Sequence, residues 1–110
     1  MPSVWVFYRI VRDDPPTVRD FLSHKELGVP LFDPGKRDIW EGVSVYRKLD
    51  DAKKKAAIYP DKGRYIAIMH IPDGETIRFA ITGRRRESHF TCWGRAERLL
   101  ACVVETVRVN

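Results

Sequence analysis

The chain has 110 residues, of which 44% are hydrophobic and 32% are charged, and its formal net charge is +5. This length and composition predict one globular domain, residues 1–110, and argue against a disordered chain. No Cys-x-x-Cys pair, signal peptide or membrane-spanning run is present, so we expect a cytoplasmic protein with no zinc site and no membrane partner.

The first half of the chain predicts two strands and one helix. Residues 4–10 are β-branched or aromatic apart from Arg9, which is typical of a central strand buried on both faces. Residues 14–25 begin with an acidic cap and prolines, and then place apolar side chains on one face, so we expect a helix there. A Pro-Gly loop precedes residues 39–46, which predict the second strand.

The second half predicts a helix at residues 50–59, from its acidic first turn and its narrow alanine face. Apolar or alternating runs predict further strands at residues 64–71, 76–81 and 102–109. Residues 88–93 fit either a short strand or an ordered loop, and residues 95–101 fit either a helical turn or the start of the last strand. Together these elements predict an α+β fold with a mixed, curved sheet of about five to six strands and two main helices. We expect Phe7, Val45, Ile68 and Leu100 to be buried in its core.

Two polar residues lie inside apolar strands and are the first candidates for a site. Because an unpaired buried charge is costly, Arg9 either grips a phosphate or a carboxylate, or lies at a strand end and reaches water. Ser44 lies between Val43 and Val45, where its hydroxyl bonds either a ligand or the neighbouring backbone.

Two carboxylates and two aromatic side chains late in the chain are further candidates. Glu97 or Glu105, aimed into a cleft, would hold a ribose hydroxyl or stabilise an oxocarbenium-like centre. The alternative for each, which the abundance of arginines favours, is an ion pair. His89 and Trp93 alternate on one face of a short strand, where they would either stack on a planar ligand ring or belong to the core.

The excess of positive charge suits an anionic partner, such as a nucleotide or an acidic protein. It is spread along the chain, however, and a run such as Arg84-Arg85-Arg86 in a loop is more often only solvated. We therefore expect at most weak, salt-sensitive binding of nucleic acid.

Taken in chain order, three short motifs resemble the ADP-ribosyltransferase superfamily. That family has an arginine or histidine on an early strand, a serine-containing strand leading to an alanine-bearing helix, and a late catalytic glutamate. The matching residues here are Tyr8-Arg9, then Gly42-Val43-Ser44-Val45-Tyr46 followed by Ala52, Ala56 and Ala57, and finally Ala96-Glu97-Arg98-Leu99-Leu100.

The resemblance implies that the protein binds NAD as its substrate and transfers ADP-ribose or cleaves the nicotinamide–ribose bond. Arg9 would contact a phosphate or ribose, Ser44 would support the nicotinamide ribose, and Glu97 would stabilise the charge that develops at the anomeric carbon. We expect these three to converge on one cleft, with three aromatic side chains around its rim: Tyr46, His89 and Trp93. The alternative is a non-enzymatic interaction module with a basic surface for an acidic protein or nucleic acid.

Overall fold

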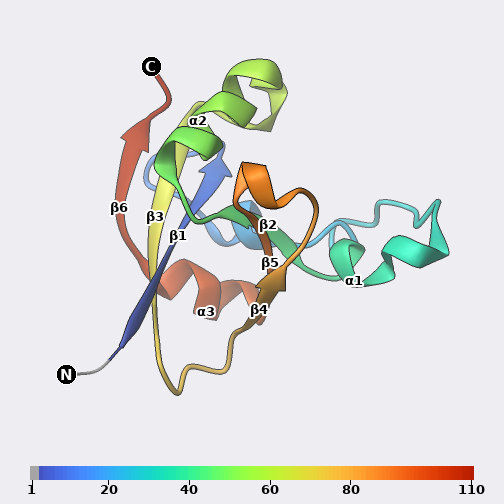
Figure 1. The fold of residues 1–110 in the computed structure, drawn as a ribbon. Coiled ribbons are helices and arrows are strands. Elements are labelled where there is room, and N and C mark those ends of the chain that lie inside the picture. The colour runs from blue at the N-terminus through green and yellow to red at the C-terminus, as the bar shows by residue number, and fades with distance from the viewer. Residues whose placement is uncertain (1–2) are drawn as a thin grey trace.

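The computed structural model describes residues 3–110, which form one six-stranded sheet with three α-helices (Figure 1). The strands are β1 (Val4–Val11), β2 (Val43–Tyr46), β3 (Tyr65–Pro72), β4 (Arg78–Ile81), β5 (His89–Trp93) and β6 (Val103–Arg108). The helices are α1 (Arg37–Trp40), α2 (Leu49–Ile58) and α3 (Ala96–Ala101), and the 3₁₀ turns are η1 (Val18–Phe21), η2 (Pro34–Lys36), η3 (Pro60–Lys62) and η4 (Arg85–Glu87). The predicted α+β class is therefore confirmed. No helix within residues 3–110 is long and apolar enough to span a membrane.

The sheet has the order β4-β5-β2-β1-β3-β6, and every neighbouring pair is antiparallel. The expectation of a mixed sheet was wrong on this point. The strands β2 and β3, which α2 connects, run in the same direction, but β1 lies between them and is antiparallel to both. Parallel strands are thus present in the fold without being neighbours in the sheet.

The central strand β1 is held very differently on its two sides. It pairs with β3 along its whole length, from Val4 opposite Pro72 to Val11 opposite Tyr65. With β2 it has one registered pair, Tyr8 opposite Tyr46. Beyond that pair β1 and β2 diverge, so the space between them needs side chains to fill it.

Each face of the sheet has its own hydrophobic cluster and its own helix (Figure 1). On one face, α2 places Ala52 and Ala56 against Ile10, Tyr46 and Ile66. On the opposite face, α3 and η1 cover a larger cluster that includes Phe7, Val11, Phe21, Val45, Met69 and Leu99. Because side chains alternate along a strand, Arg9 belongs to the α3 face of β1 and Ser44 to the α2 face of β2.

The helix expected at residues 50–59 is confirmed as α2, and the strands outside residues 39–46 are each found within two residues of their predicted bounds. The helix expected at residues 14–25 was wrong, because only η1 is helical there. The carbonyl oxygen of Asp20, which a helix would pair with a later N–H, instead accepts from the Arg9 side chain.

The second strand is also shorter than predicted, because residues 37–40 form α1 and only residues 43–46 are extended. Local bonds hold this turn: the Glu41 N–H donates to the Arg37 carbonyl, and the Glu41 carboxylate lies 3.7 Å from the Arg37 guanidinium. The segment that carries α1 projects from the body of the molecule (Figure 1).

The core prediction holds for Phe7 and Val45, which are fully buried, and was wrong for Ile68 and Leu100, which are only partly buried. Ile68 lies on the α2 face opposite Glu105 of the edge strand β6, and α2 is too short to cover it. Leu100 follows the buried Leu99 along α3 and packs at the margin of the larger cluster.

Candidate functional site

The candidate site is a cavity of about 380 Å³ that opens where β1 and β2 diverge; we call it the cleft. Three of the predicted site residues line it, namely Arg9, Ser44 and Tyr46. Ligand pockets in proteins begin at about 300 Å³, so the cleft is large enough to hold part of a nucleotide. Its remaining polar lining consists of Arg12, Asp13, Arg19, Asp20, His24 and Lys62.

Arg9 fills the gap between the diverging strands. Its Nε donates to the Asp20 carbonyl at 2.8 Å, its Nη1 donates to the Ser44 carbonyl at 2.7 Å, and its guanidinium lies 5.8 Å from the centroid of the Phe21 ring. Burial lowers the pKa of Arg9 to about 10, which leaves the side chain charged at neutral pH. The structure therefore places a fixed positive charge at the base of the cleft.

Ser44 and Tyr46 form the β2 wall of the cleft. Ser44 pairs with Thr91 of β5, and its hydroxyl makes no hydrogen bond to any other residue within 3–110. That hydroxyl is therefore free to bond a ligand. Burial, together with the negative charge of Glu87, raises the pKa of Tyr46 to about 12, so this phenol stays neutral.

Further positive charges surround the opening. Arg12, Arg19 and Lys62 join Arg9 in the lining, and burial lowers the pKa of Lys62, with the nearby charges of Arg9 and Lys55 adding to the effect. A lowered lysine pKa beside other cations marks a place where an anion would be stabilising.

Two carboxylates in the lining only partly offset this charge. Asp20 is committed to the fold, because its carboxylate accepts the N–H groups of Arg12 at 2.9 Å and Thr17 at 3.0 Å. Asp13 is exposed and takes part in no ion pair or side-chain hydrogen bond within residues 3–110. Four cations face two carboxylates, which leaves the cleft with an excess of two positive charges.

A glycine fixes the position of the Lys62 turn. Gly63 follows η3 with φ +149°, and a Cβ there would collide with the carbonyl of Val11 at the end of β1. The backbone of the turn therefore lies directly against β1, a contact that only glycine permits. Lys62 reaches the cleft because of this close approach.

His89 lies behind the cleft wall and does not line it. Its ring meets the Tyr46 ring edge-on, with 5.3 Å between centroids. Its Nδ1 lies 3.0 Å from the Thr82 carbonyl and 2.9 Å from the Thr82 hydroxyl, and since a carbonyl only accepts, Nδ1 carries the hydrogen. Burial lowers the pKa of His89, so the imidazole is neutral at physiological pH.

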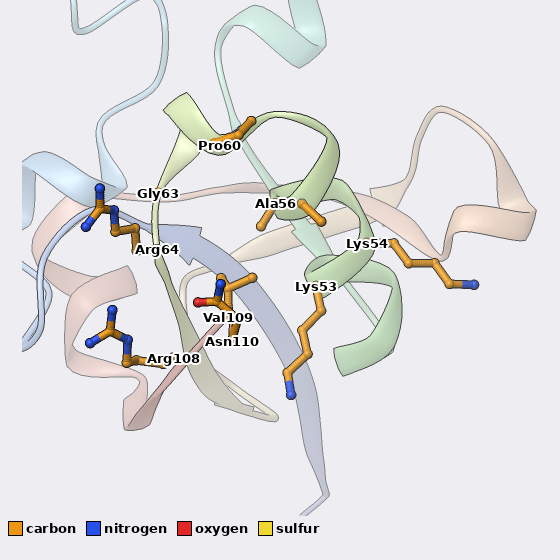
Figure 2. A pocket seen from close by; sticks show the side chains of 10 residues that line it. Lys53, Lys54, Ala56, Pro60, Gly63, Arg64, Arg108, Val109 and Asn110 are labelled. Carbon is orange, nitrogen blue, oxygen red and sulfur yellow. The ribbon is translucent and has the colours of Figure 1, made fainter.

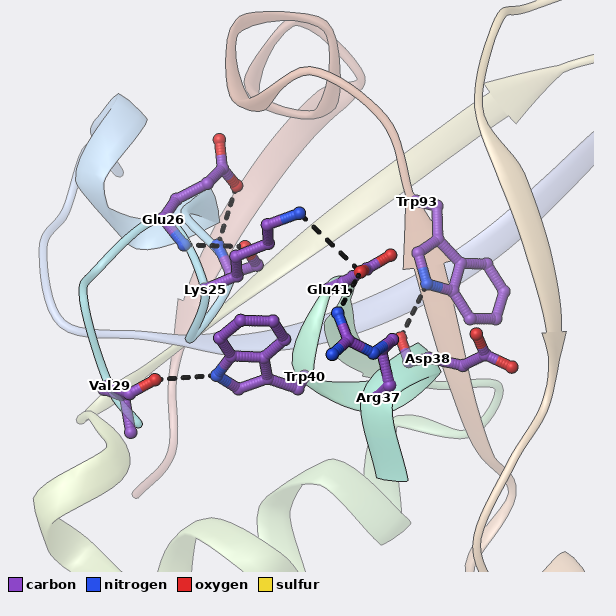
Figure 3. Close-up of polar contacts among 9 residues, drawn as sticks. Lys25, Glu26, Val29, Arg37, Asp38, Trp40, Glu41 and Trp93 are labelled. Carbon is purple, nitrogen blue, oxygen red and sulfur yellow. Dashed lines mark hydrogen bonds and ion pairs between the residues drawn. The ribbon is translucent and has the colours of Figure 1, made fainter. Parts of the chain in front are cut away.

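Trp93 is also outside the cleft and serves the fold. Its indole Nε1 donates to the Asp38 carbonyl at 2.7 Å (Figure 3). The Arg78 guanidinium lies 4.7 Å from the centroid of the indole ring. In the same region Trp40 donates to the Val29 carbonyl at 2.7 Å. The Trp93 bond attaches α1 to β5, and the Trp40 bond holds α1 to the loop that precedes it.

Glu97 does not converge with Arg9 and Ser44, so that expectation was wrong. Residues 96–101 form a helix that buries Ala96 and Leu99, which turns Glu97 to solvent, where its carboxylate lies 3.8 Å from the Arg95 guanidinium. Glu105 is likewise exposed, on the edge strand β6, and neither carboxylate lines the cleft.

The sequence reasoning missed Arg12, Arg19 and Lys62, because each is an exposed cation on a turn. One signal was present for Lys62, since it precedes a glycine that directly follows a proline-initiated turn. Within residues 3–110, no group of three histidine, cysteine, aspartate or glutamate side chains is placed to hold a metal ion.

Comparisons with protein-family models, with curated proteins and with solved structures found no match to this chain.

Proposed function

We propose that the protein binds NAD in the cleft, as an ADP-ribosyltransferase-like protein. The observation that supports this most is the Arg9 guanidinium, which two backbone carbonyls hold in place beneath an opening lined by Arg12, Arg19 and Lys62. A diphosphate carries two negative charges at neutral pH, and these would balance the excess of two positive charges in the cleft.

The two walls of the cleft suit the rest of the ligand. In this proposal the Ser44 hydroxyl would bond a ribose, and the neutral Tyr46 would offer an aromatic edge to a nicotinamide ring. Because Arg9 is already fixed by the fold, it loses little freedom when a ligand binds.

Transfer chemistry would need a carboxylate beside the anomeric carbon. In that step the nicotinamide–ribose bond breaks, its electron pair leaves with nicotinamide, and an acceptor nucleophile bonds the carbon that has become electron-poor. Asp20 is occupied by two N–H groups and Glu97 lies outside the cleft, so we assign the stabilising role to Asp13, the lining carboxylate without a partner.

Calorimetry with NAD tests the binding. The variant Arg12→Gln/Arg19→Gln removes two exposed cations from the cleft and should weaken NAD binding about tenfold or more. Arg84→Gln/Arg86→Gln removes the same charge from the loop after β4 and should leave affinity within about twofold. Equal losses in both variants, or no heat with the unchanged protein, would remove the proposal.

Release of nicotinamide from NAD tests the chemistry separately. If Asp13 acts on the developing charge, Asp13→Asn should abolish release while NAD affinity stays nearly unchanged, and Glu97→Gln should change neither. Loss of release in Glu97→Gln alone would return the role to Glu97. A protein that binds NAD without releasing nicotinamide would be a binding module and not a transferase.

A further inference from the structure

A second hollow lies on the other side of the η3 turn, and it shares no lining residue with the cleft. It has a volume of about 690 Å³ and runs between α2 and the adjoining ends of β3 and β6 (Figure 2); we call it the groove. It is lined by Lys53, Lys54, Ala56, Ala57, Pro60, Gly63, Arg64, Arg108, Val109 and Asn110.

The charged side chains that line the groove all have the same sign. Four of its lining side chains are cations, Lys53, Lys54, Arg64 and Arg108, and no aspartate or glutamate lines it. None of the four takes part in an ion pair within residues 3–110. Figure 2 shows Lys53, Arg64 and Arg108 around Val109, whereas Lys54 points away from them.

The floor of the groove is apolar and fixed. Ala56, Ala57, Pro60 and Val109 contribute small hydrophobic side chains. The Val109 N–H donates to the Arg64 carbonyl at 2.9 Å, so the pairing of β3 with β6 continues into the groove. Such a floor leaves room for a short apolar side chain of a ligand, with the cations above it.

We propose that the groove binds an acidic, extended segment of a partner protein, with carboxylates toward Arg64, Arg108 and Lys53 and an apolar side chain on the alanine floor. Four cationic side chains, with no aspartate or glutamate side chain among the lining residues, make the groove complementary to such a segment. Nucleic acid fits less well, because no aromatic side chain lines the groove to stack on a base. This proposal concerns a different surface from the NAD cleft and does not depend on it.

Fluorescence anisotropy tests the groove with a short labelled peptide in which glutamates flank a central leucine. The peptide should bind the unchanged protein, and affinity should fall as salt is raised. Arg64→Glu/Arg108→Glu should lower the affinity about tenfold or more, whereas Arg84→Glu/Arg86→Glu should change it by about twofold at most. NAD affinity should be equal in both variants, which separates a failure here from a failure at the cleft.

Two altered peptides and one oligonucleotide complete the test. A peptide with glutamine in place of every glutamate should not bind, and one with glycine in place of the leucine should bind more weakly. Equal binding of the glutamine peptide, or an unchanged affinity in Arg64→Glu/Arg108→Glu, would overturn the proposal. Tighter binding of an oligothymidylate of equal length would overturn it in favour of nucleic acid.

Discussion

The cleft and the groove are both lined by four cations, but the fold treats those cations differently. In the cleft, Arg9 is fixed by the carbonyls of Asp20 and Ser44, and Lys62 is held by a turn that packs against β1. In the groove, Arg64 and Arg108 are exposed and donate no side-chain hydrogen bond within residues 3–110. A charge that hydrogen bonds hold in place favours a small ligand of fixed shape, while exposed charges without such bonds suit a flexible chain that meets them in several ways.

The largest difference between the two sites should be in the free energy of unfolding that is lost when one arginine is removed from each. Arg9→Met leaves the Asp20 and Ser44 carbonyls without their donor, and should lower the free energy of unfolding by about 2–4 kcal/mol. Arg108→Met, in the groove, should change it by about 0.5 kcal/mol or less, because that side chain is exposed. Urea denaturation of both variants measures the difference; similar values would mean that Arg9 is not a structural element.

A smaller effect should be the pH dependence of stability that arises from His89, which packs against the Tyr46 wall of the cleft. Burial lowers the folded-state pKa of His89 below the usual 6.5, in spite of Glu87 nearby and with Lys55 and Lys62 adding to the effect. The unfolded chain then binds this proton more readily, so the stability that neutral His89 provides is complete above pH 6.5 and is lost as pH falls through the folded-state pKa.

His89→Asn is the matched variant, because its amide N–H can replace Nδ1 toward the Thr82 carbonyl without titrating. Denaturant midpoints measured from neutral to mildly acidic pH should fall less steeply for His89→Asn than for the unchanged protein. Peptide binding in the groove should show no matching change in this range. Parallel pH curves for the two proteins would show that His89 does not carry the dependence.

The smallest effect should come from the lysines of the two sites. Lys62→Gln removes a partly desolvated cation beside Arg9, and should raise the free energy of unfolding by roughly 0.5 kcal/mol or less while weakening NAD binding. Because the folded-state pKa of Lys62 lies below 10.5, the gain should vanish in solutions more alkaline than that, where the lysine is neutral in both states.

Lys54→Gln, at the edge of the groove, should leave both stability and NAD affinity unchanged within error, which makes it the control. Thermal unfolding with and without NAD measures both variants. A loss of stability in Lys62→Gln would mean that this cation holds the turn, and would remove the distinction between a functional and a structural charge at that position.

Much of the fold could be predicted because its signals are local. The apolar runs at residues 4–11 and 65–72 and the acidic start of α2 are present in the sequence itself. The failure at residues 14–25 has a distant cause, since the side chain of Arg9 takes the Asp20 carbonyl from eleven positions away. A sequence pattern over residues 14–25 cannot show that a side chain outside this range will take the Asp20 carbonyl.

The residues that line the cleft could be predicted only in part. Arg9 and Ser44 could be found because a polar residue in an apolar strand needs a reason. Glu97 could not be placed, because one extra helical turn before β6 decides whether it faces a cleft or solvent. Arg12 and Lys62 line one cavity only because the η3 turn packs against β1. That packing requires a glycine at position 63, since a Cβ there would collide with Val11.

The position of η3 between the two sites also affects how fast ligands arrive. Lys62 faces the cleft while Pro60 and Gly63 face the groove, so one three-residue turn separates two surfaces of the same sign. Two such surfaces side by side produce a single electric field that extends about 10 Å at moderate salt and attracts anions before contact. Ligands of both sites should therefore associate faster at low ionic strength, and their association rates should fall together as salt is raised.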